Sequence, residues 1–192
     1  MKKLIAIAAL LISSVATFAQ QPVGSFSVQP KVGLNIDSLT KADNTDPRFG
    51  LVAGAEFMYQ ASDMLGVSFG ALYSMQGCTA TENKVDYTYK LNYINLPVLA
   101  NVYIAPGFAV KLGLQPAFCI NNKAKAKSGG SSVQTDGIDE NTFELSMPIG
   151  LSYEFSNFVI EGRYNFGLTK AFKDEDNKIS VSQFTVGYKL PL

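Results

Sequence analysis

Apolar and polar residues alternate with a period of two along most of this chain. In the range Phe158–Leu168, every second residue is apolar or glycine, while the residues between them include Glu161 and Arg163. Successive side chains of a β-strand point to opposite sides, so this pattern gives one apolar face and one face of charged and small residues. A helical repeat of 3.6 residues does not produce it. The pattern therefore predicts β-strands with two chemically different faces.

The same alternation recurs along the chain and predicts eight strands. Their ranges are Phe26–Ile36, Phe49–Tyr59, Leu65–Met75, Tyr87–Ile104, Phe108–Ile120, Phe143–Phe155, Phe158–Leu168 and Phe184–Leu192. The fourth range is the least regular, because its phase changes near Tyr93–Pro97. Such a change predicts a β-bulge at Pro97.

The connections between these ranges are short and long in turn. The short ones are Gln60–Met64, Ala105–Gly107 and Ser156–Asn157, and the long polar ones are Asp37–Arg48, Gly77–Asp86, Asn121–Thr142 and Thr169–Ser180. Short turns at one end and long loops at the other are typical of bacterial outer-membrane barrels. We therefore expect an all-β fold, an eight-stranded antiparallel up-and-down transmembrane β-barrel. An even number of strands places both termini on the short-turn, periplasmic side.

The size of the side chains indicates which face looks outward. The apolar faces carry Phe, Tyr, Leu and Met at most positions, which is too much volume for the narrow lumen of eight strands. The opposite faces carry Gly, Ser, Ala, Gln and Asn with isolated charges, which fit inside. A soluble barrel around a ligand would have the reverse orientation. Aromatic residues near the short turns, such as Phe26, Tyr59 and Tyr188, suit a girdle at a membrane interface.

The first 19 residues have the pattern of a secretory signal peptide. Lys2 and Lys3 precede an unbroken apolar run, and small residues at Thr17 and Ala19 suit a cleavage site. The run is shorter than the roughly 18 apolar residues of a membrane-spanning helix. We expect cleavage near Ala19, which leaves residues 20–192 as the barrel domain.

Charged residues recur on the predicted inner faces. They are Lys31, Glu56, Lys111, Glu144, Glu154, Glu161, Arg163 and Lys189. Buried charges must be paired or solvated, and four acidic with four basic groups can pair across a narrow lumen. A structural network of salt bridges is the first interpretation, and a narrow ion path is the second. A catalytic pair such as Glu144 with Glu154 is not expected, because these two lie a full strand length apart.

Composition excludes several classes of function. The formal net charge is zero, which removes the basic footprint of a nucleic-acid-binding protein. The chain has no His, so Ser-His-Asp and Cys-His nucleophiles and His-based zinc sites are impossible. We expect no enzyme activity, no cofactor, no metal site and no nucleic-acid partner.

Cys78 and Cys119 are the two cysteines of the chain, near the outer ends of the third and fifth predicted strands. One strand lies between them, which separates ideal Cα positions by about 10 Å and exceeds the reach of a disulfide. A flexible connection after the third strand could close this distance, and the periplasm is oxidising. Both states of the pair therefore remain open.

The long connections are where recognition is expected, because loops on a rigid scaffold commonly carry it. The range Asn121–Thr142 begins with Lys123, Lys125 and Lys127 and ends with acidic residues. A solvated loop and a contact to a cation or surface glycan are the alternatives. Neither this range nor Thr169–Ser180 has the pattern of an EF-hand calcium loop.

Three segments resemble the PorT-like outer-membrane β-barrel family, small porin-family proteins similar to OmpA- and OmpX-type barrels. They are Gly33–Asn35, Tyr93–Leu99 and Arg163–Thr169. The resemblance covers the whole mature chain and implies insertion by the outer-membrane assembly machinery. The end Tyr188–Leu192 resembles the family's C-terminal assembly signal, but with Pro191 and a final leucine instead of an aromatic residue.

From these features we expect a monomeric, structural or adhesive protein of the outer membrane. Its lipid and lipopolysaccharide would surround the barrel, and a surface ligand or protein partner would bind the long loops. The alternatives are a narrow porin-like diffusion channel and an accessory component of a secretion system, since the family includes one.

Overall fold

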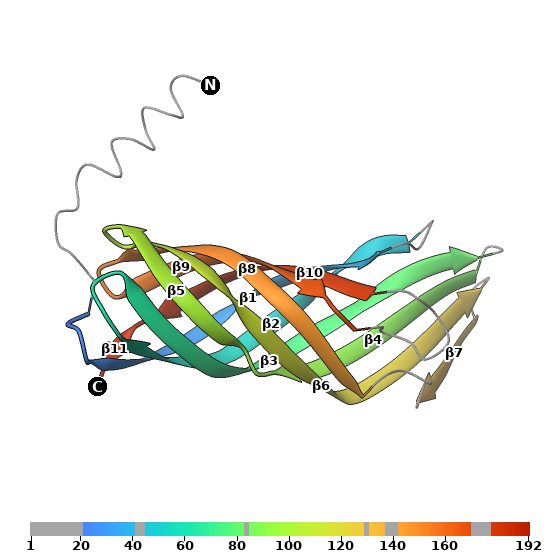
Figure 1. The fold of residues 1–192 in the computed structure, drawn as a ribbon. Helices are drawn as coiled ribbons and strands as arrows, with labels where there is room; N and C mark the ends of the chain where they lie inside the picture. Colours follow the sequence, from blue (N-terminus) through green and yellow to red (C-terminus); the bar gives the residue numbers. More distant parts are fainter. Residues whose placement is uncertain (1–20, 41–44, 83–84, 129–130, 137–141, 170–177) are drawn as a thin grey trace, which may run out of the picture.

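The computed structural model describes residues 21–40, 45–82, 85–128, 131–136, 142–169 and 178–192. At the far ends of the longer strands it describes the backbone alone. These residues form an antiparallel sheet (Figure 1). Its strands are β1 (Phe26–Thr40), β2 (Thr45–Gln60), β3 (Leu65–Glu82), β4 (Val85–Asn95), β5 (Val98–Ala105), β6 (Phe108–Ser128), β7 (Ser131–Asp136), β8 (Phe143–Phe155), β9 (Phe158–Gly167), β10 (Lys178–Tyr188) and β11 (Leu190–Pro191).

The sheet closes into a barrel because β1 pairs with both β2 and β10. β5 continues β4 after Pro97, and β11 continues β10 after Lys189. When each of these pairs is counted as one strand, the wall of the barrel has eight strands. β7 pairs with the far end of β6, outside this ring. Closure leaves no unpaired sheet edge within the ring, which is what a barrel in hydrocarbon requires. The predicted eight-stranded antiparallel transmembrane barrel is confirmed.

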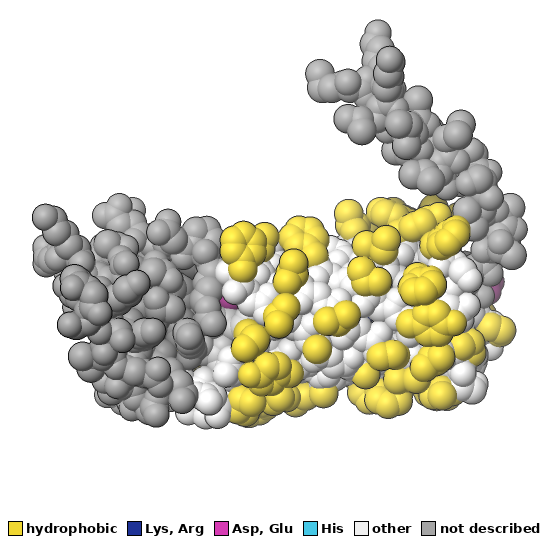
Figure 2. Space-filling model, turned by 180° about the vertical axis from the view of Figure 1, so that it is seen from behind, with side chains coloured by type: hydrophobic (Ala, Val, Ile, Leu, Met, Phe, Trp, Pro, Cys, Tyr) yellow, Lys and Arg dark blue, Asp and Glu magenta, His cyan; other side chains and the backbone are white. Residues whose placement is uncertain are grey.

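The two faces of the wall have the predicted orientation. Phe158 and Leu112 are 52 % and 50 % exposed on the outside, whereas Glu161 and Arg163 are 2 % and 3 % exposed on the inside. On the face seen in Figure 2, hydrophobic side chains cover much of the described surface and charged side chains are nearly absent. The polar lumen is therefore the core of the protein. The exposed apolar side chains form a belt around the outside of the barrel.

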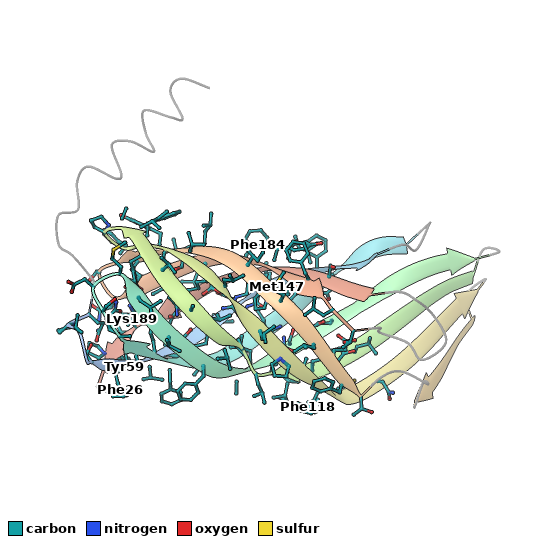
Figure 3. All side chains as sticks on the ribbon, viewed as in Figure 1. Phe26, Tyr59, Phe118, Met147, Phe184 and Lys189 are labelled. Carbon is teal, nitrogen blue, oxygen red and sulfur yellow. The ribbon has the colours of Figure 1, made fainter. Side chains whose placement is uncertain are left out.

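Aromatic side chains pair on the outer surface at both ends of the belt. Near the short turns, Phe26 packs on Tyr59 with ring centroids 4.8 Å apart, and both point away from the ribbon (Figure 3). Toward the long connections, the rings of Phe118 and Phe143 lie 5.4 Å apart. Aromatic rings at two levels are the arrangement found at the two interfaces of a membrane.

The predicted bulge at Pro97 is wrong. Tyr93, Asn95 and Leu99 are all buried, so the alternation passes through Pro97 without a change of phase. Proline lacks an N–H, which interrupts the ladder without adding a residue. The register shift lies earlier in the chain, between Asn92 and Tyr93 of β4, where β6 carries the extra residue Ile120.

Several strands are longer than predicted. β3 and β4 remain paired as far as Glu82 and Val85, and β6 continues to Ser128, so much of two predicted loops is sheet. The ends of β3 and β6 carry small and polar residues in place of large apolar ones, so they lack the apolar face that marks the other strands. Figure 1 shows β2, β3, β4, β6 and β7 extending beyond the ends of β8 and β9. Among the described residues, no helix has the length and apolar character needed to cross a membrane.

Candidate functional site: charged clusters in the barrel lumen

The middle of the lumen holds a cluster of five charged side chains from four strands. They are Lys31 of β1, Glu56 of β2, Lys111 of β6, and Glu161 and Arg163 of β9. Each occupies an inward position of its strand, so closure of the sheet brings them together although up to 132 positions separate them in sequence. We call this group the central ion cluster.

Each carboxylate of the central ion cluster contacts more than one cation. Lys31 Nζ lies 2.8 Å from Glu56 Oε2 and 2.9 Å from Glu161 Oε2. Lys111 Nζ lies 2.7 Å from Glu161 Oε2. Arg163 donates from Nη2 to Glu56 Oε1 at 2.8 Å and from Nε to Glu161 Oε1 at 2.6 Å. These contacts tie β9 to β1, β2 and β6 through the interior.

The central ion cluster contains three cations and two carboxylates, and water reaches it very little. The side chains of Lys31 and Arg163 are 0 % exposed, and those of Glu56 and Glu161 are 2 % and 1 % exposed. Buried charges are tolerated only when they are paired and hydrogen-bonded. The cluster therefore occupies the lumen with oppositely charged groups that contact one another, and its formal charge is +1.

A second cluster lies at the short-turn end of the lumen. Lys189 Nζ lies 2.5 Å from both carboxylate oxygens of Glu154, and the Tyr103 hydroxyl donates to Glu154 Oε1 at 2.7 Å. The Lys189 ammonium also lies 5.9 Å from the centre of the Tyr103 ring. Lys189 is the residue between β10 and β11. Its ion pair therefore joins the C-terminal strand to β8 at the inner wall, where Figure 3 labels it.

Glu144 is the predicted lumen charge that lies apart from both clusters. It is half-buried near the start of β8, and its Oε1 accepts a hydrogen bond from Tyr93 at 2.8 Å. Glu154 lies at the other end of the same strand. The eight predicted charges are thus divided into a group of five, a pair and a single residue.

Sequence reasoning did not single out the two tyrosines that complete these contacts. Tyr93 and Tyr103 are 0 % and 4 % exposed, and both donate to carboxylates of β8. They lie on the fourth predicted strand, whose irregular pattern concealed their inward phase. Their even spacing with the inward Asn95, Leu99 and Asn101 was the available signal.

The cysteine pair lies partly outside the described side chains. Cys119 pairs in register with Tyr93, and Cys78 pairs with Tyr89 on the other side of β4. The side chain of Cys78 is not described, so a disulfide between the two stays a prediction. Migration of the full-length protein in non-reducing and reducing gels distinguishes the two states.

Within the described residues, no group of three or more Cys, Asp and Glu side chains has the arrangement of a metal site. The carboxylates of Glu56, Glu144, Glu154 and Glu161 are engaged by lysine, arginine and tyrosine side chains. The arrangement suits charge neutralisation and cross-bracing of the wall. These side chains occupy the middle and the short-turn end of the lumen, and the outside of the barrel is apolar.

A closed antiparallel barrel with an apolar exterior, aromatic levels at both ends and charges confined to its lumen is a transmembrane barrel of the outer-membrane type. The chain belongs to the family described as outer membrane protein beta-barrel domain, whose model matches residues 18–173. The resemblance to small outer-membrane barrels is therefore confirmed. No curated protein sequence matches the chain.

Two solved structures show the same fold. Ail, the attachment invasion locus protein of Yersinia pestis, in complex with the heparin analogue sucrose octasulfate, has a TM-score of 0.55 and 17 % identity. The alignment covers 88 % of this chain and 100 % of Ail. Neisserial surface protein A has a TM-score of 0.54 and 17 % identity, with 86 % of this chain and 97 % of that chain covered. The protein is an outer-membrane β-barrel.

Proposed function

We propose that this protein is a surface-interaction protein, in which a closed barrel anchors a ligand-binding sheet extension outside the cell. Cleavage after Ala19 would release residues 20–192 into the periplasm, and both termini would stay on that side. The observation that carries the proposal is the extension itself. β6 runs on to Ser128 after Phe118, its last residue paired with β8, and β7 adds a hairpin to it.

The filled lumen supports an anchoring role over a transport role. Seven of the eight predicted lumen charges are buried, and the contacts described above pair each of them with an opposite charge. Ions would have to displace these pairs to pass. Proteins of this kind act through the parts that extend beyond the membrane.

An anionic surface glycan is the class of ligand that we propose for the extension. Lys123, Lys125 and Lys127 occupy alternate positions of β6, and Lys90 of β4 is in register with Lys123. Alternate positions of a strand, together with the residue directly opposite, share one face of a sheet. In the strand register, Asp86 lies opposite Lys127 and Asp136 lies opposite Lys123. Four lysines against two aspartates leave a positive excess.

Binding to immobilised heparin tests this proposal. The neighbour Ail was solved with a heparin analogue, which makes heparin a suitable sulfated probe. Changing Lys123, Lys125 and Lys127 to Gln is expected to lower binding at least tenfold and to flatten its salt dependence. The matched control changes Lys170, Lys173 and Lys178 to Gln, which removes the same charge from the range Thr169–Ser180. Equal loss in both variants, or no loss in the first, would contradict the proposal.

The belt and the C-terminal strand define the other partners we propose. Lipid and lipopolysaccharide would cover the exposed apolar side chains, and the assembly machinery would receive the segment Tyr188–Leu192. We propose a monomer without enzyme activity, because the barrel closes on itself and its carboxylates are engaged in ion pairs.

A narrow diffusion channel is the second candidate, since charges line the lumen throughout its middle. Planar-bilayer recording of the wild-type protein distinguishes the two functions. If the wild-type barrel is a closed anchor, no discrete conductance steps are expected. If it is a channel, the wild-type protein gives such steps.

A further inference from the structure

Beyond the central ion cluster, the lumen contains a layer of amide side chains. Asn35, Gln115 and Asn165 each follow a member of the cluster by four residues along the same strand, namely Lys31, Lys111 and Glu161. Four residues of a tilted strand correspond to about 10 Å along the barrel axis. Gln183 pairs in register with Asn35, and Asn95 occupies the inward position of β4 next to Leu72 of β3. We call these five residues the amide layer.

An apolar cluster lies directly beyond the amide layer, toward the long connections. Ala117 follows Gln115 by two positions on β6, whereas Val181 and Tyr93 precede Gln183 and Asn95 by two positions on β10 and β4, which run in the opposite direction. They pack with Leu91, and Cys119 adjoins them. β10 and β4 lie on opposite sides of the ring, so these side chains meet across the lumen. We call this group the apolar plug.

The amide layer is rich in polar atoms without a protein partner. Both side-chain polar atoms of Asn95, Asn165 and Gln183, together with Asn35 Oδ1 and Gln115 Oε1, make no hydrogen bond with the described residues. The five side chains are at most 2 % exposed. Arg163 Nη1, at the edge of the central ion cluster, also makes no hydrogen bond with the described residues.

These atoms need partners that the chain does not supply. Leaving a buried polar atom unsatisfied costs about 1–3 kcal/mol, and folded domains are stable by only about 5–15 kcal/mol. The atoms include both hydrogen-bond donors and acceptors, and most of them belong to uncharged amide groups. A neutral molecule that can both donate and accept hydrogen bonds would therefore suit them. Water is such a molecule, and buried water commonly serves buried amides in this way.

We propose that the amide layer is a closed water chamber with two independent seals, the central ion cluster on one side and the apolar plug on the other. The two seals resist ions for different reasons. The cluster blocks the lumen with paired charges, and the plug blocks it with packed apolar side chains, beside which the buried Asp37 lies in register with Val181. A continuous path through the barrel therefore requires that both seals be removed. This inference concerns the lumen alone and is independent of any ligand bound by the extension.

Planar-bilayer recording of three variants tests the two seals. One variant removes part of the cluster with Glu161→Ser and Arg163→Ser, the second removes part of the plug with Tyr93→Ser and Val181→Ser, and the third combines all four changes. Heat-modifiable migration in gels verifies that each variant is folded. The expected result is discrete conductance in the combined variant and its absence in the wild type and the first two. Conductance after opening one seal alone, or a folded combined variant that does not conduct, would overturn the proposal.

Nuclear magnetic resonance of the wild-type protein tests the chamber without any substitution in the seals. Cross-peaks between water and the side-chain amide hydrogens of Asn95, Asn165 and Gln183 are expected. Asn101 is the control for the amide hydrogens, because its Nδ2 donates to Ser68 Oγ at 3.0 Å and to two carbonyl oxygens, although its Oδ1 also makes no hydrogen bond with the described residues. Weaker cross-peaks with water are expected there than at the three chamber residues. If no cross-peaks with water are seen at these three residues and their amides bond to one another instead, the proposal of a water chamber is overturned. This outcome does not depend on whether the variant with four substitutions folds.

Discussion

Arg163 on β9 donates a hydrogen bond to Glu56 on β2 through the lumen, with 2.8 Å between Nη2 and Oε1. β1 and β10 lie between these two strands in the closed sheet. The contact is therefore made across the interior and not between neighbours in the wall. It braces two parts of the barrel that backbone pairing alone does not connect.

Removing the guanidinium is expected to be costly. Arg163→Met leaves Glu56 and Glu161 buried with fewer donors, and breaking one side of a buried ion pair costs about 3–5 kcal/mol. Unfolding by denaturant from lipid vesicles, followed by gel migration, measures the loss in the free energy of unfolding.

The partner substitution supplies the control for Arg163→Met. Glu56→Leu alone raises the formal charge of the cluster from +1 to +2 and is expected to be destabilising as well, whereas Glu56→Leu combined with Arg163→Met returns it to +1. The loss in the combined variant should be smaller than the sum of the two single losses by about 1 kcal/mol or more. Strict additivity would show that the contact does not couple the two residues.

The tyrosine at the short-turn end has a smaller predicted effect. Tyr103→Phe removes a donor to Glu154 but leaves Lys189 on both carboxylate oxygens. A loss of about 1–3 kcal/mol is expected for a buried hydrogen bond to a charged group. Tyr188→Phe is the matched control, because Tyr188 is 41 % exposed on the lipid-facing side and should change stability little. A larger effect at Tyr188 would contradict the assignment.

Most of the barrel could be predicted from sequence because one physical rule governs its wall. A residue such as Leu112 faces lipid and its neighbour Lys111 faces the lumen, so alternation encodes the fold directly. The extension is different, because in β6 the residues Lys123, Lys125 and Lys127 alternate only with alanine, which gives no large apolar face. β6 from Asn121 to Ser128 was therefore expected to be a loop and is strand.

The grouping of the lumen charges was less predictable than their orientation. Alternation places Glu144 and Glu161 on the inside, but it says nothing of height along the barrel. That height depends on the register between strands, such as the pairing of Arg163 with Gln183. Closure then separates Glu144 from the central ion cluster. The irregular fourth strand hid Tyr93 and Tyr103, because proline interrupts its ladder without changing its phase.

The turn between β8 and β9 contains a residue in an unfavourable backbone conformation. Ser156 has a φ of 53°, in the left-handed region where side chains are disfavoured, whereas the β5–β6 turn uses Gly107 with a φ of 72°. Ser156→Gly is expected to stabilise the barrel by up to about 1 kcal/mol, and Gly107→Ala to destabilise it by about 1–2 kcal/mol. Midpoints of denaturant unfolding measure both. Opposite signs would show that these turns are not under the constraint that their φ angles indicate.

The orientation of the wall yields the strictest prediction. Leu112 lies on the outer face between Phe108 and Phe118, about midway between the aromatic levels, and is 50 % exposed. If that face meets hydrocarbon, Leu112→Arg costs about 2–4 kcal/mol, because an arginine at the middle of the bilayer is poorly solvated. Leu190→Arg is the matched control, since Leu190 is 42 % exposed but lies at the short-turn end, where the cost falls to about 0–1 kcal/mol. Refolding into vesicles gives both free energies. The difference between the two positions is the informative quantity, because a barrel surrounded by water would tolerate arginine equally well at either one.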